Sequence, residues 1–284
     1  IGEPKLHKTV QDIINMKKEK KKISVITSYD YTLASLCDKA GIDVMLVGDS
    51  AGMVMLGYEN TIAVTMDQMC MFTEAVSRAR KSSLLVADLP FMSYQASIED
   101  AINNSGRLIK AGADAVKLEG GSIMAETISA IVDVGIPVMG HIGLQPQTTT
   151  LSEGYKVQGK TKDSAMKLIE DAKELEDAGV FSIALEMVSH EVGQIISESV
   201  NIPTIGIGSG VNCDGQVLVV QDLLGMYDKI KPKFAKRYMN LSEDIVKSLE
   251  EYRTDVESGS FPAKENSFSM NEEELKKLRE ALGS

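Results

Sequence analysis

The sequence predicts an α/β fold, a closed (β/α)8 barrel of the TIM type, and three observations favour it. Eight short runs rich in β-branched residues recur along the 284-residue chain, and several are apolar throughout, as in parallel strands covered on both faces. Segments with helical spacing of apolar residues fall between many of these runs. Glycine repeatedly ends a helical segment just before the next strand, as in Lys110-Ala111-Gly112-Ala113-Asp114.

The expected elements follow one another in βα order along the chain. The predicted strands span residues 23–28, 43–48, 83–88, 114–119, 136–140, 181–186, 203–207 and 216–220. The clearest amphipathic helices are predicted at 65–81, 97–111, 122–134, 161–178 and 191–199. Repeated βα units of this kind form a parallel sheet that closes on itself.

The C-terminal part of the chain differs from the rest. Strand patterns fade from about residue 229, and the stretches 241–253 and 270–282 are charged and helix-prone. Because one barrel commonly takes about 250 residues, we expect a single barrel domain over 1–284. Its core would span about 23–228, and about 229–284 would form a peripheral extension packed outside the barrel.

Charge and composition exclude several classes of protein. The chain has 41 acidic and 30 basic side chains, for a net charge of -11, which argues against a nucleic-acid partner because phosphate binding needs a cationic face. No apolar run approaches the roughly 20 residues that span a bilayer, so we expect no membrane segment. Residues 1–5 lack the apolar core of a signal peptide, and we expect a cytoplasmic protein. The three separated cysteines suggest neither a disulfide framework nor a zinc site.

Carboxylates close four of the predicted strands. Asp49, Asp88, Glu119 and Glu186 stand at or next to the carboxyl ends of their strands, where barrel enzymes place their active sites. Each carboxylate alone has a structural alternative as a helix cap. Together they would repel one another unless a cation or proton balanced them, and oxygen ligands suit Mg²⁺.

A lysine accompanies this acidic rim. Lys117 stands two residues before Glu119, so both side chains should point into the barrel while Val116 and Leu118 face the helices. A lysine inside a barrel needs an anion, either the neighbouring carboxylates or a substrate carboxylate, and we favour the substrate. His141 follows the fifth predicted strand, where it either binds a ligand or orients the turn.

An ordered set of motifs resembles the ketopantoate hydroxymethyltransferase family, also called 3-methyl-2-oxobutanoate hydroxymethyltransferases. The resemblance runs from about residue 9 to 241. It includes TSYDYTLA (27–34), VGDSAGMVMLGYENT (47–61), ADLPFMSY (87–94), VKLEGG (116–121), GHIGLQPQ (140–147), GYKVQGKT (154–161) and CDGQVLV (213–219). The sequence departs from the family pattern at Gln221, where His is common, and at Ser209, where Ala is usual, which affects rim packing or the folate side more than the acidic cluster.

The resemblance implies a role for each residue of the rim. Asp49, Asp88 and Glu119 would hold Mg²⁺ directly or through water. The 2-oxo acid would be bound by Asp49, Ser50, Asp88 and Lys117. Glu186 would be the catalytic proton acceptor. From its position in the sequence, and not from the resemblance, His141 is added as a supporting residue.

The resemblance also implies a reaction and an assembly. A hydroxymethyl group would pass from 5,10-methylenetetrahydrofolate to 3-methyl-2-oxobutanoate, giving 2-dehydropantoate and tetrahydrofolate on the route to pantothenate and coenzyme A. The protein would be a homo-oligomer, a decamer in this family.

Two other readings compete with this one. The barrel would belong to the phosphoenolpyruvate mutase/isocitrate lyase-like group, so the chain is alternatively a Mg²⁺-dependent carbon–carbon lyase or a phosphoenolpyruvate mutase-like enzyme. Isocitrate lyase relatives carry a Lys-Lys-Cys-Gly-His loop, and Cys37, Cys70 and Cys213 are not followed by Gly-His. A noncatalytic barrel that merely binds a cation is a second alternative, and the presence of both Lys117 and Glu186 argues against it.

Overall fold

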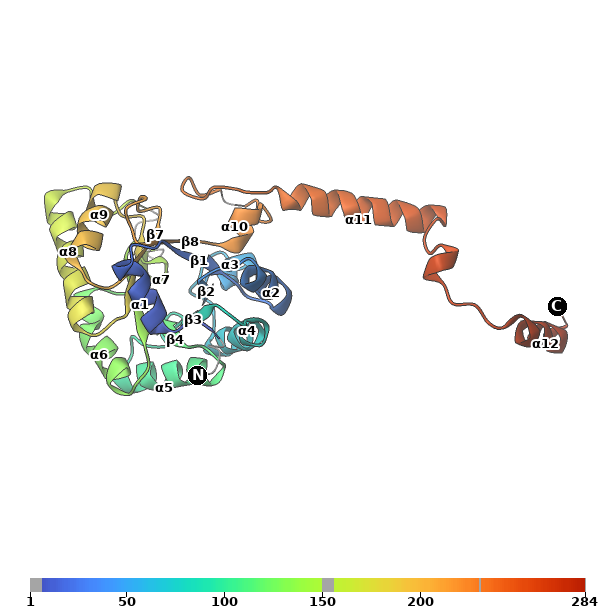
Figure 1. The fold of residues 1–284 in the computed structure, drawn as a ribbon, viewed down its shortest axis with the longest axis horizontal. Helices are drawn as coiled ribbons and strands as arrows, with labels where there is room; N and C mark the ends of the chain where they lie inside the picture. Colours follow the sequence, from blue (N-terminus) through green and yellow to red (C-terminus); the bar gives the residue numbers. More distant parts are fainter. Residues whose placement is uncertain (1–6, 150–155, 230, 284) are drawn as a thin grey trace.

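A closed parallel barrel forms the body of the protein. The structure, a computed structural model, describes residues 7–149, 156–229 and 231–283. Within them, eight strands pair in chain order, and the last pairs with the first (Figure 1). They are β1 Ile23–Thr27, β2 Val44–Val47, β3 Leu84–Asp88, β4 Ala115–Lys117, β5 Val138–Gly143, β6 Ser182–Glu186, β7 Thr204–Ile207 and β8 Gly215–Leu218. The predicted barrel and its eight strands are confirmed.

Helices surround this barrel and connect its strands. In the described residues they are α1 Val10–Lys18, α2 Tyr31–Lys39, α3 Ala51–Val54, α4 Met66–Ala79, α5 Ile98–Lys110, α6 Ala125–Asp133, α7 Pro146–Thr149, α8 Lys162–Asp177, α9 His190–Ser199 and α10 Val220–Leu224, with a 3-10 turn at Ser122–Met124. The side chains of Thr65, Ser97 and Thr161 accept backbone hydrogen bonds at the starts of α4, α5 and α8, which stabilises the first turns. These helices match the predicted ranges within a few residues.

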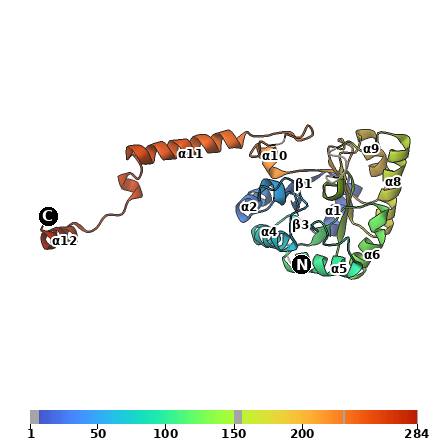
Figure 2. The same ribbon diagram turned by 180° about the vertical axis from the view of Figure 1, so that it is seen from behind.

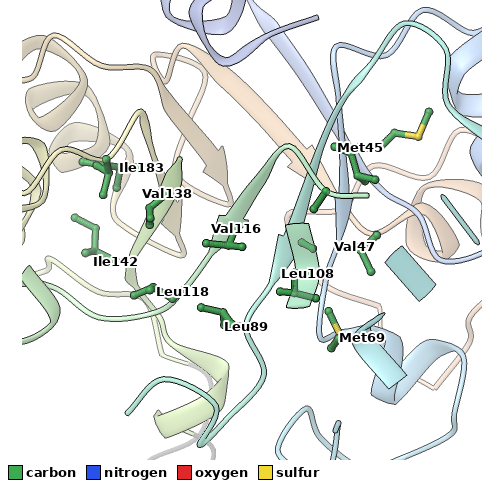
Figure 3. Close-up of a cluster of buried hydrophobic side chains, with 14 of the residues drawn as sticks. Met45, Val47, Met69, Leu89, Leu108, Val116, Leu118, Val138, Ile142 and Ile183 are labelled. Atoms are coloured by element: carbon green, nitrogen blue, oxygen red, sulfur yellow. The ribbon is translucent and has the colours of Figure 1, made fainter. Parts of the chain in front are cut away.

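Apolar side chains pack in two layers, one inside the barrel and one between barrel and helices. The inner layer includes Val44, Leu84 and Ala115 from adjacent strands. Val116 belongs to the outer layer, where Figure 3 shows it near Val138. The alternation along β4 therefore confirms that Val116 faces the helices and that its neighbour Lys117 faces the interior.

The C-terminal helices lie away from the barrel. α11 Leu241–Ser258 and α12 Glu272–Leu282 form where helix-prone stretches are predicted, with a 3-10 turn at Lys264–Asn266 between them. Figures 1 and 2 show this segment reaching outward, and neither helix has a buried residue. The expectation that they pack against the outside of the barrel is therefore wrong for this chain, in which apolar side chains of α11 such as Leu249 and Tyr252 stay exposed. The division into core and extension stays a prediction.

No helix in the described part of the chain is long and apolar enough to cross a membrane.

Candidate active site

The polar side chains predicted at the strand ends meet in one cavity. It has a volume of about 160 Å³ and lies at the carboxyl ends of the strands. Strands β2 to β6, with the residues that directly follow them, supply seven polar residues of its lining: Asp49, Ser50, Asp88, Lys117, Glu119, His141 and Glu186. Thr27, Thr61 and Asp222 line it as well. All seven residues that were predicted for the site thus line a single pocket.

Lys117 and Asp88 form a buried ion pair across neighbouring strands. Asp88 pairs with Lys117 in the register of β3 and β4, and Lys117 Nζ donates to Asp88 Oδ1 at 2.8 Å. Burial alone lowers the pKa of Lys117, yet the charges of Asp88, Asp49 and Glu119 outweigh it and raise that pKa. The lysine is therefore charged at neutral pH. Its partner in this structure is a carboxylate of the chain, and its contact with substrate stays a prediction.

Asp49 lies beside this pair. Its backbone N–H donates to Asp88 Oδ2 at 3.2 Å. Burial, and next the charge of Asp88, raise the pKa of Asp49 to about 7. The adjacent Ser50 hydroxyl lies 2.8 Å from the hydroxyl of the buried Tyr29, so this serine is oriented within the cavity.

Gln147 is the residue of the site that sequence reasoning missed. It lies in the short helix α7 and is buried. Its Nε2 donates to Asp49 Oδ2 at 2.9 Å, and its backbone N–H donates to Glu119 Oε2 at 3.1 Å. Tyr94 Oη donates to its Oε1 at 2.8 Å. Its only signal in the sequence was its place at the end of the GHIGLQPQ motif.

His141 stands between two carboxylates. β5 runs to Gly143, so the residue lies within the strand instead of after it. Its Nδ1 is 3.6 Å from Glu119 Oε1, and its Nε2 is 3.3 Å from Glu186 Oε2. Among the described residues neither buried ring nitrogen makes a hydrogen bond. The imidazole is thus placed to contact a further group in the cavity.

The charges of the cavity fit a hard cation. Five carboxylates and one lysine line it, and burial followed by the charge of Asp49 raises the pKa of Glu119. In the ranges that the structure describes, no three His, Cys, Asp or Glu side chains are arranged to hold an ion by themselves. Asp49 and Asp88 are in contact through the Asp49 backbone N–H and both line the cavity. Two such carboxylates suit Mg²⁺, an ion that is commonly held by one or two carboxylates together with water and substrate oxygens.

The two departures from the family pattern lie around this rim. Ser209 Oγ donates to Leu185 O at 2.7 Å and accepts from Val188 N–H at 3.1 Å, so it braces the backbone on both sides of Glu186. Gln221 is buried, and its Nε2 lies 3.4 Å from Met55 Sδ. Both side chains take part in rim packing.

The fold and site define a class of protein. A parallel barrel with charged side chains converging at the carboxyl ends of its strands is the plan of TIM-barrel enzymes. Similar solved structures include phosphonopyruvate hydrolase, with a TM-score of 0.61 and 11% identity, covering 96% of this chain and 99% of that one. Another is 2,3-dimethylmalate lyase, a PEP mutase/isocitrate lyase superfamily member, with a TM-score of 0.57 and 14% identity, covering 96% of each chain. These likenesses confirm the predicted barrel fold.

Comparison of sequences identifies the family, which the likeness of folds does not. The family model for ketopantoate hydroxymethyltransferase matches residues 7–264. A relative from Nitrosopumilus maritimus is 88% identical over 279 residues, which cover 98% of this chain and 100% of the relative. One from Cenarchaeum symbiosum is 59% identical over 254 residues, covering 89% and 96%. Both are named 3-methyl-2-oxobutanoate hydroxymethyltransferase. The chain belongs to the ketopantoate hydroxymethyltransferase family and is an enzyme, a transferase.

Proposed function

We propose that this enzyme transfers a hydroxymethyl group from 5,10-methylenetetrahydrofolate to 3-methyl-2-oxobutanoate in a Mg²⁺-dependent reaction. The products would be 2-dehydropantoate and tetrahydrofolate, with water supplying the hydroxyl oxygen, on the route to pantothenate and coenzyme A. The observation that carries the proposal is that Asp49, Asp88 and Glu186 line one cavity. This arrangement suits removal of a proton beside a 2-oxo group.

The acidic pair and Lys117 would bind the 2-oxo acid. Asp49 and Asp88 would hold Mg²⁺, with Glu119 acting through water. Bound there, Mg²⁺ would stabilise the negative charge that develops on the 2-oxo oxygen, as metal Lewis acids do. The charged Lys117, whose Nζ lies 2.8 Å from Asp88, would complement the substrate carboxylate.

Glu186 would act as the general base. Its side chain lines the cavity and is 17% exposed, so a substrate carbon can reach it. Water would break the two carbon–nitrogen bonds that hold the one-carbon unit, leaving two N–H groups on tetrahydrofolate and the unit as a carbonyl carbon. Glu186 would take the proton from C3, the electron pair left on C3 would form the bond to that carbon, and the carbonyl oxygen would take up a proton to become the hydroxyl. His141, 3.3 Å from Glu186, would orient the carboxylate. General base catalysis of this kind contributes about 10² to 10⁴-fold.

Proton NMR tests the proposal directly. The purified protein, Mg²⁺, 3-methyl-2-oxobutanoate and 5,10-methylenetetrahydrofolate are mixed, and the appearance of 2-dehydropantoate is followed. Enzyme-dependent product supports the proposal. Folded, metal-loaded protein that forms no product would shift the assignment to another one-carbon donor or to the lyase-like alternative. The cytoplasmic location, the homodecamer and the absence of nucleic-acid and membrane partners stay predictions.

A further inference from the structure

A second cavity opens directly beside the first one. Its volume is about 280 Å³, and it shares Ser50, Met53, Glu186, Val219, Asp222 and Phe234 with the acidic cavity. The rest of its wall is mostly apolar and includes Met187 and Tyr227. We name it the donor cavity. Since Glu186 lines both spaces, a molecule in the donor cavity would lie next to the carbon from which Glu186 takes a proton.

Asp222 lines this cavity with a carboxylate whose acceptor oxygens have no partner in the described residues. It lies in the short helix α10 and is half-buried. Within the described ranges, its carboxylate has neither a hydrogen bond nor an ion pair, since the nearby Arg237 contacts Asp228 at 3.3 Å and the carbonyl of Tyr227 at 2.9 Å. Burial raises the pKa of Asp222, and Arg237 opposes this rise. Its two oxygens are therefore available to accept hydrogen bonds from a ligand with N–H donors.

The walls suit a flat ring. Phe234 and Tyr227 supply aromatic surface, and Met53 and Met187 supply adaptable apolar contacts. Phe234 packs closely on Gly208, where an added Cβ would lie 3.1 Å from the ring. Met187 has a φ of 47°, uncommon for a residue with a side chain. This backbone conformation directly follows Glu186, so the two adjacent side chains both reach the donor cavity.

We propose that the donor cavity binds the bicyclic ring of a reduced pterin, the part of the one-carbon donor that carries the transferable group. Asp222 accepts two hydrogen bonds from the N3–H and 2-amino groups of the ring, because a carboxylate offers two acceptors to two parallel donors. The volume is just below the range of about 300 to 1,000 Å³ for drug-sized ligands, so it fits the ring and leaves the tail of a folate outside. This inference rests on the proposed function.

The test separates donor binding from chemistry on the 2-oxo acid. Asp222→Asn retains a similar shape but presents an amide N–H₂ that opposes the pterin donors. We expect its KM for 5,10-methylenetetrahydrofolate to rise about 10 to 100-fold, as for loss of a hydrogen-bonded charge. The control is Asp228→Asn, an exposed residue outside the cavity lining, with a KM close to that of the parent. Exchange of the C3 hydrogen of 3-methyl-2-oxobutanoate with solvent deuterium, measured without donor, reports on the chemistry of the 2-oxo acid separately from donor binding.

Two probes identify what the cavity recognises. Tetrahydrofolate and 6-methyltetrahydropterin, which lacks the tail, are titrated against the parent and against Asp222→Asn. We expect the parent to bind both and the variant to lose affinity for both by a similar factor. If the parent binds only tetrahydrofolate, recognition is through the tail and the proposal is overturned. Phe234→Ala is a second variant that should also raise the KM for the donor, with Phe234→Tyr restoring it.

Failure of the donor-cavity proposal and failure of the proposed function give different results in these measurements. If Asp222→Asn and Phe234→Ala both exchange C3 hydrogen and keep the parent KM for the donor, the donor cavity is refuted and the proposed function stands. If the parent protein exchanges no C3 hydrogen and forms no product, the proposed function itself fails.

Discussion

Gln147 joins two carboxylates of the site, since its Nε2 donates to Asp49 Oδ2 at 2.9 Å and its backbone N–H contacts Glu119 at 3.1 Å. A glutamine side chain can do this because its amide offers donors to an acid and an acceptor to a hydroxyl. Here the acceptor takes the Tyr94 hydroxyl at 2.8 Å. One buried amide thus fixes the orientation of Asp49, a candidate Mg²⁺ ligand.

Gln147→Ala should lower the affinity of the enzyme for Mg²⁺, so that more Mg²⁺ is needed for activity. Without the side-chain amide, Asp49 loses the contact that orients it, and changes in such supporting residues commonly cost about 10 to 100-fold in metal affinity. A Mg²⁺ titration of C3 hydrogen exchange measures the effect. Thr148→Ala, at the exposed neighbouring position, is the control. An unchanged Mg²⁺ requirement in Gln147→Ala would show that Asp49 needs no such support.

Glu186→Gln should bind the 2-oxo acid and Mg²⁺ but lose C3 hydrogen exchange. The amide keeps the shape of the side chain and cannot accept the proton, so the rate should fall by about 10² to 10⁴-fold. Deuterium incorporation followed by NMR gives the rate, and a binding titration gives the affinity. Exchange at the parent rate would remove Glu186 as the base.

Lys117→Met should destabilise the folded protein by about 3 to 5 kcal/mol, because it leaves the charge of Asp88 buried without its partner. The double variant Lys117→Met with Asp88→Asn should recover part of this loss, since the charge of Asp88 is then removed together with its partner. Denaturant unfolding of the three proteins measures the difference. Equal losses in the single and double variants would contradict the pairing.

Asp49→Asn should stabilise the metal-free protein at high pH. Burial raises the pKa of Asp49 from 3.8 to about 7, so the folded state binds the proton more tightly than the unfolded state. The stability that this proton contributes is fully present below pH 3.8 and is lost as the pH rises to about 7.

The asparagine variant has no charge to bury. Its advantage over the parent should therefore grow between these two pH values and reach roughly 1 to 3 kcal/mol above pH 7. Thermal unfolding with a chelator present, at several pH values, gives the difference. A constant difference across this range would contradict the burial of an ionised Asp49. Added Mg²⁺ should restore stability in the parent and have less effect on the variant.

Several parts of the site were accessible from the sequence because their signals are local. The period of two along a strand placed Lys117 inside the barrel and Val116 outside it, as the structure has them. Asp49 and Glu186 each follow or close a predicted strand, and the carboxyl ends of parallel strands meet at one end of a barrel, so both residues were predicted on the same rim. Both predictions follow from position along the chain and require no knowledge of contacts between distant residues.

Other parts were not accessible from the sequence. The short helix α7 has only four residues, too few to show a period. The partner of Lys117 depends on the register between β3 and β4, and register is set when the barrel closes. The outward course of α11 and α12 was also missed, since helix propensity says whether a helix forms and not what it packs against.

The sequence by itself determined the order of strands and helices, the acidic character of one rim and, through its motifs, the family. These properties follow from residue type and spacing along the chain. The tertiary structure decided which groups touch: Gln147 on Asp49, His141 between Glu119 and Glu186, and a second cavity at Asp222. Contacts between residues far apart in sequence depend on how the barrel closes and how its loops fold over the rim, and no local pattern of residues encodes that geometry.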